Sequence, residues 1–132
     1  MRRNSALLDT NYLIKALIPN SHEAKQLRTW IAGRVDLITS SICWYEFLCG
    51  PVDDGGIEVI KMILQGRIMP FNENQALLAS RLYNKTGRKR RFRVDAMIAA
   101  AAISNNAFLA TDNSRDFSVF EEMGLSLVTT EL

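Results

Sequence analysis

The chain has 132 residues, of which 48% are hydrophobic and 23% charged, and its formal net charge is +2. This length and composition fit one folded domain, residues 1–132, with a sizeable core. No apolar run reaches the roughly 18 residues of a membrane-spanning helix. The apolar run after the basic start, Ala6–Leu8, is too short for a signal peptide. We therefore expect a soluble, cytoplasmic protein with no membrane association.

Short apolar runs alternate with stretches of helical periodicity along the whole chain. Breakers such as Pro19, Gly33 and Gly66 separate the predicted helices. Strands that alternate with helices indicate a parallel sheet covered on both faces. The sequence therefore predicts an α/β fold with a mostly parallel sheet of four to five short strands. The runs with the length of buried strands are 6–8, 36–39, 68–71, 107–110 and 125–128.

Cysteine and histidine are scarce in this chain. There are two cysteines, Cys43 and Cys49, and one histidine, His22. No further Cys or His stands near the cysteines to complete a zinc site, so we expect two buried, reduced thiols. The histidine has no nucleophile beside it, which leaves little room for a Ser/His/Asp triad.

The stretch from Phe92 to Phe117 places acids at both ends of one apolar unit. Asp95 precedes a run of apolar residues, most of them Ala, the best helix former. A predicted buried strand follows at 107–110, and Asp112 and Asp116 come soon after it. Ligands of open α/β sheets bind outside the carboxyl ends of the strands. Acids at such an end therefore suggest a functional site.

Carboxylates occur at four separated places, each at a strand end or on an otherwise apolar helix: Asp9, Glu46, Asp95 and the pair Asp112/Asp116. Each has a plain structural explanation, as a helix cap, a turn residue or a helix edge in solvent. A doubly wound sheet, however, places the first strand beside strand 107–110, so that their ends face one crevice. Carboxylates without Cys or His favour Mg²⁺ or Mn²⁺. Such an ion activates water for attack on a phosphodiester.

A basic run ends two residues before Asp95. Six of the sixteen basic residues fall within nine positions. A solvated loop is the plain explanation, but the position beside an acid favours contact with RNA phosphates. The residues of the run are Lys85, Arg88, Lys89, Arg90, Arg91 and Arg93.

Four acid-bearing segments follow one another along the chain: LDTNYL (8–13), SSICWYE (40–46), DAMIAA (95–100) and TDNSRDF (111–117). In order and separation they resemble the motifs of PIN-domain proteins, most of all the VapC-type ribonuclease toxins of toxin–antitoxin pairs. The resemblance covers essentially the whole chain. It implies a three-layer sandwich, endoribonuclease activity, a homodimer and a small VapB-like antitoxin partner. The active site that it implies is Asp9, Glu46 and Asp95 around Mg²⁺ or Mn²⁺.

The fourth motif departs from the family pattern. The family often has an acid two places after the Thr, where this chain has Asn113. The fourth acid is therefore Asp112 or Asp116, and we favour Asp116 because the Asp-Phe pair matches the family. Asn113 is then a candidate polar ligand or orienting group. Thr10 and Thr111 are expected to support the acids.

The leading hypothesis is metal-dependent hydrolysis of single-stranded RNA that leaves a 5′-phosphate. One alternative is a catalytically inactive PIN-like module that binds RNA or docks a protein and keeps the acids as relics. Another is a phosphatase of the haloacid-dehalogenase type. That chemistry requires a second Asp two residues after the first, and Asn11 stands there.

Overall fold

The computed structural model describes residues 4–128 and contains a four-stranded sheet in the order β3-β2-β1-β4. All neighbouring strands run parallel. The chain builds β2 and β3 on one side of β1 and then crosses to place β4 on the other. The carboxyl ends of β1 and β4 meet at this switch point, which is where open α/β sheets bind their ligands. The strands are β1 (Ser5–Leu8), β2 (Asp36–Ser40), β3 (Ile68–Met69) and β4 (Phe108–Ala110).

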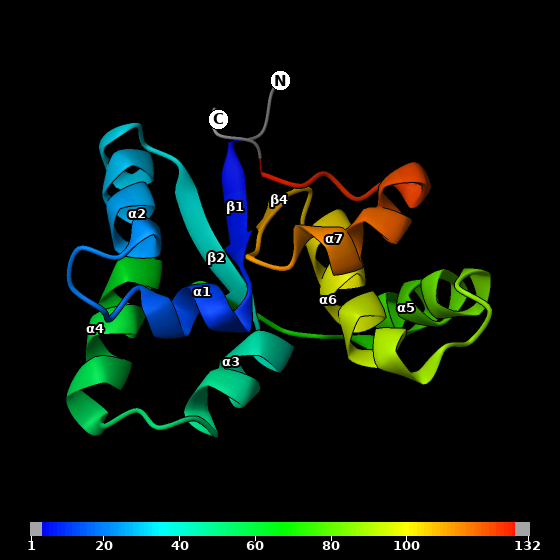
Figure 1. Cartoon of the computed structure of the whole chain (residues 1–132), viewed down its shortest axis with the longest axis horizontal. Coiled ribbons are helices and arrows are strands. Elements are labelled where there is room, and N and C mark those ends of the chain that lie inside the picture. The colour runs from blue at the N-terminus through cyan, green and yellow to red at the C-terminus, as the bar shows by residue number, and fades with distance from the viewer. Residues whose placement is uncertain (1–3, 129–132) are drawn as a thin grey trace.

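Helices cover both faces of the sheet and confirm the predicted three-layer α/β fold (Figure 1). On one face, α2 (His22–Ala32) and α4 (Asp54–Leu64) pack against β2. On the other, α6 (Arg93–Ser104) packs against β4 and β2, and α5 (Glu73–Lys85) packs against α6. None of the helices within residues 4–128 has the length and apolar character needed to cross a membrane.

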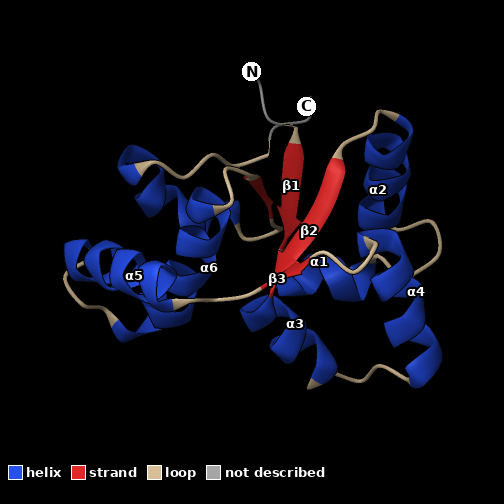
Figure 2. Ribbon diagram, turned by 180° about the vertical axis from the view of Figure 1, so that it is seen from behind, coloured by secondary structure: helices blue, strands red, loops and turns tan. Residues whose placement is uncertain are grey.

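Two short helices begin where β1 and β2 end. They are α1 (Thr10–Lys15) and α3 (Ser41–Leu48), and they contact each other below the sheet (Figure 2). Ser40 starts α3 as its N-cap, because its hydroxyl accepts a hydrogen bond from the Cys43 N–H at 3.1 Å. After β4, the chain forms α7 (Ser114–Phe117) and a 3₁₀ helix at Ser118–Met123.

The alanine-rich helix α6 contains a run of fully buried residues. Ala99, Ala100, Ala101 and Ala102 are all 0% exposed. Ala combines high helix propensity with the smallest side chain that still packs, so the helix axis can approach the sheet closely. This packing fixes the position of the first turn of α6, which carries Asp95.

Three expectations about local structure are wrong. The strand predicted at 125–128 is reduced to a single parallel bridge between Leu109 and Leu127. The strand predicted at 68–71 ends at Met69, and the Phe71 N–H donates to the Ser41 hydroxyl instead of a sheet partner. Cys49 is exposed, whereas Cys43 is buried. Residues six apart on a helix lie on different faces, so only one of the two thiols reaches the core.

Candidate active site

Asp9 is a buried carboxylate at the carboxyl end of β1. The residue is 5% exposed, and its N–H donates to the Ala110 carbonyl of the neighbouring strand at 2.9 Å. Its side chain accepts hydrogen bonds from the Thr111 hydroxyl and from the Thr10 N–H, both at 2.8 Å. Burial raises the pKa of Asp9 above its ordinary value, the Glu46 charge adds to this effect, and the hydrogen bonds oppose it. Asp9 caps α1, as its plain structural explanation predicts, and its carboxylate also lies near enough to Glu46 and Asp95 for their charges to interact.

Glu46 approaches Asp9 from α3. The Thr10 hydroxyl donates to Glu46 Oε1 at 2.7 Å, which gives this half-buried acid a partner on an otherwise apolar helix. Three residues earlier, Cys43 lies beside Asp9, with Sγ 3.9 Å from Oδ1. Burial raises the pKa of the Cys43 thiol to about 12, so it stays neutral. The sequence interpretation missed this contact, although the spacing of three puts Cys43 and Glu46 on one helix face.

Asp95 joins these two acids from the first turn of α6. It is the third residue of the helix and not its N-cap, which is Phe92. Burial raises the pKa of Asp95 from 3.8 to about 6, and the charges of Asp9, Asp116 and Glu46 add to this effect. Three carboxylates from separated parts of the chain therefore lie near enough to Asp95 to repel its charge.

The two candidates for the fourth acid lie in different surroundings. The Asp112 carboxylate is 3.2 Å from the Lys15 ammonium and faces Tyr12, whose pKa is raised by burial and by the Asp112 charge. Asp116, in α7, is the one that raises the pKa of Asp95. Asp116 is thus the better placed fourth acid. Asn113 contributes through its backbone N–H, which donates to the Thr111 hydroxyl at 3.0 Å.

Residues 6–123 match the family model of the PIN domain. The chain belongs to the PIN-domain family. This confirms the resemblance noted from the four motifs.

Several solved structures have a fold similar to that of this chain. FitAcB from Neisseria gonorrhoeae is 24% identical with a TM-score of 0.70, and the match covers 96% of this chain and 99% of that one. A toxin-antitoxin complex from Klebsiella pneumoniae is 25% identical with a TM-score of 0.72, covering 95% and 97%. VapBC-1 from nontypeable Haemophilus influenzae is 22% identical with a TM-score of 0.68, covering 97% and 99%. A comparison with curated proteins returned no match.

The acids of this PIN domain have the donor chemistry of a hard divalent cation. All four offer carboxylate oxygens, the ligands that Mg²⁺ and Mn²⁺ prefer. The mutual repulsion that helps to raise the pKa of Asp95 is the effect that a cation relieves. Within residues 4–128, no three His, Cys, Asp or Glu side chains stand close enough to hold an ion as they are placed. Mg²⁺ usually keeps several waters and is bound by one or two carboxylates, so an ion here would not need three protein ligands.

The basic run extends over the surface of the PIN domain from the last residue of α5 to the first residue of α6. All five predicted RNA-binding residues are exposed. The Arg91 guanidinium lies 4.5 Å from the Phe92 ring centroid, and that of Arg93 lies 5.8 Å from the Tyr83 ring centroid. Their contact with RNA stays a prediction. The five residues are Arg88, Lys89, Arg90, Arg91 and Arg93.

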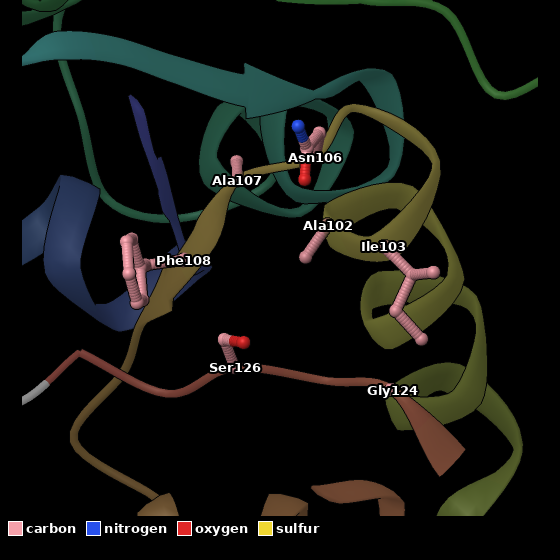
Figure 3. Close-up of a pocket in the computed structure, with 7 residues that line it drawn as sticks. All are labelled: Ala102, Ile103, Asn106, Ala107, Phe108, Gly124 and Ser126. Carbon is pink, nitrogen blue, oxygen red and sulfur yellow. The ribbon is translucent and has the colours of Figure 1, made fainter. Parts of the chain in front are cut away.

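A cavity of about 260 Å³ lies at the amino end of β4, opposite the end that leads to the acids (Figure 3). Its walls include Ala102, Ile103, Phe108, Gly124 and Ser126, and none of its lining residues is charged. This cavity is therefore separate from the candidate site.

Proposed function

We propose that this PIN domain is a metal-dependent endoribonuclease that cleaves single-stranded RNA and serves as the toxin of a toxin–antitoxin pair. The observation that carries the proposal is the convergence of Asp9, Glu46, Asp95 and Asp116. Burial and the charges of the other three acids raise the pKa of Asp95, and a bound cation would relieve this repulsion. The toxin role is supported by the similar fold of a protein solved in a toxin-antitoxin complex from Klebsiella pneumoniae. A small VapB-like antitoxin and a homodimeric state belong to the same proposal.

The site residues have distinct roles in this proposal. Asp9 and Asp95 would hold Mg²⁺ or Mn²⁺, with Glu46 and Asp116 completing the set of acids. The bound cation would supply positive charge for the phosphodiester and acidify the attacking water. Thr111 fixes the Asp9 carboxylate by its hydrogen bond, and Thr10 does the same for Glu46. Hydrolysis by water leaves a 5′-phosphate and does not require the RNA 2′-hydroxyl.

The test compares the wild-type protein with Asp95→Asn and with the control Asp36→Asn. Asp36 carries a 65% exposed side chain at the amino end of β2, at the opposite end of the strands from the acids. We expect Asp95→Asn to reduce Mn²⁺-dependent RNA cleavage by orders of magnitude through loss of a charged ligand. The rise in melting temperature on adding Mn²⁺ should shrink as well, because it follows the tightness of binding to the folded state.

The control should keep both the cleavage and the Mn²⁺ shift. Retained cleavage together with an undiminished Mn²⁺ shift in Asp95→Asn would remove this residue from the site. A wild-type protein that binds RNA but cleaves none with Mg²⁺ or Mn²⁺ would instead support the inactive RNA-binding alternative.

A further inference from the structure

A small polar recess adjoins the candidate site and has no role in the proposed hydrolysis. It has a volume of about 130 Å³ and is lined by side chains from α1, α2 and the segment after β4. We call it the Tyr12 recess. The polar residues that line it are Tyr12, His22, Gln26, Thr111 and Asp112.

The Tyr12 recess and the acid cluster share Thr111. The hydroxyl of this residue donates to Asp9 Oδ2 at 2.8 Å, and the same residue lines the recess. Tyr12 belongs to the helix that begins directly after Asp9. A single residue, Thr111, therefore connects the recess to the Asp9 carboxylate.

The size and lining of the recess suit one planar polar group. Pockets that enclose a whole ligand measure roughly 300–1,000 Å³, so this recess holds only a fragment of one. The Asp112 carboxylate offers an acceptor, the Gln26 amide offers a donor and an acceptor, and the His22 ring offers a stacking face. These are the groups with which proteins read the unpaired bases of RNA.

The charge balance in the recess indicates which bases it accepts. Lys15 lies 3.2 Å from Asp112 Oδ2 and offsets the carboxylate charge. The recess can therefore accept a neutral base and does not select for a cationic ligand. The remaining lone pairs of Asp112 accept N–H groups. Adenine, cytosine and guanine each carry an exocyclic amino group, at N6, N4 and N2, whereas uracil has no amino group and offers a carboxylate only its ring N–H.

We propose that the Tyr12 recess binds one base of the RNA substrate beside the cleaved phosphate and prefers an amino-bearing base over uracil. The inference rests on the proposed function for its substrate, single-stranded RNA. It assigns sequence preference to Gln26 and Asp112, which lie outside the set of acids proposed to hold the cation.

The experiment measures binding of four RNA tetranucleotides, each of one base, in the presence of chelator so that nothing is cleaved. We expect the wild-type protein to bind the uracil tetranucleotide about 10-fold more weakly than the best of the other three, the effect of one hydrogen bond to a charged group. Gln26→Leu should weaken binding of the amino-bearing tetranucleotides. Asp112→Asn should reduce the discrimination to about twofold, because an amide can also donate to uracil O4.

The matched control is again Asp36→Asn, which makes the same chemical change at the other end of the strands and should keep the wild-type discrimination. Melting curves confirm that each variant is folded. Equal binding of all four tetranucleotides by the wild-type protein, or full discrimination in both recess variants, overturns the proposal. Discrimination without any Mg²⁺- or Mn²⁺-dependent cleavage would refute the nuclease and leave the recess in place. Cleavage without discrimination would refute the recess proposal and leave the nuclease in place.

Discussion

The Asp95 carboxyl is held in a state that costs the folded protein stability when no cation is bound. Its pKa lies near 6 in the folded protein, against 3.8 ordinarily. Above pH 6 the group is charged in both the folded and the unfolded chain, and the full cost of burying it among like charges is present. Below its ordinary pKa it is neutral in both, and the cost is absent. The cost is therefore relieved as the pH falls from about 6 to about 4.

Asp95→Asn should remove this cost. In chelator at pH 7 to 8 we expect the variant to be more stable than the wild-type protein by about 1 to 2 kcal/mol, after allowance for solvent screening. The advantage should decrease as the pH falls from 6 to 4. Denaturant unfolding at several pH values measures it, with Asp36→Asn as the control for loss of an exposed acid. An advantage that does not change with pH would mean that Asp95 titrates normally and is not part of a repulsive cluster.

At the scale of elements, the segment between α5 and α6 combines a backbone turn with concentrated positive charge. Gly87 has φ of 80° and Arg88 has φ of 59°, so the chain reverses here through two left-handed residues. The Arg88 side chain donates a hydrogen bond to the Asn84 side-chain oxygen, and the guanidinium groups of Arg91 and Arg93 lie over aromatic rings. The turn therefore presents a basic surface that leads directly into the helix carrying Asp95.

Replacing Arg88, Lys89, Arg90 and Arg91 together with Gln should weaken RNA binding and flatten its salt dependence. Single-stranded nucleic acid releases about 0.7 counterions per neutralised phosphate, so the slope of log K against log salt should fall by up to about 3. Binding of a fluorescent RNA at several salt concentrations measures this slope. The control replaces Lys25, Arg28 and Lys61, three exposed cations on α2 and α4. An unchanged slope in the quadruple variant would show that the basic run is only a solvated turn.

The elements themselves were largely predictable from the sequence, because apolar periodicity and breakers record the local choice between helix and strand. The outcome at 125–128 was not predictable in this way. An apolar run does not show whether it pairs with a neighbouring strand over several residues or, as here, at a single bridge. In the site, the motif order predicted which acids would meet. The Asp-Phe pair favoured Asp116 over Asp112, but the sequence could not reveal the pairing of Asp112 with Lys15, because these two residues are distant along the chain.

At the scale of the whole molecule, the proposed antitoxin should act on the same cluster of acids. A partner that places a cationic side chain among the carboxylates gains from relieving their repulsion and also excludes the metal and the RNA. Co-expression with a small protein encoded beside this one should give a stoichiometric complex in which RNA cleavage is suppressed. The complex should also melt at a higher temperature than the free PIN domain. Full cleavage activity in a complex confirmed by mass would contradict this mode of inhibition.

The acid cluster draws on both ends of the chain. Asp9 follows the first strand, but the hydroxyl that fixes it belongs to Thr111, directly after the last strand, and Asp116 comes later still. Chains leave the ribosome from the amino end. A growing chain therefore exposes Asp9 and Glu46 long before β4 exists to pair with β1. The proposed nuclease would therefore gain its full set of acids only after residues 108–116 have been translated, and would be inert toward its own message until then.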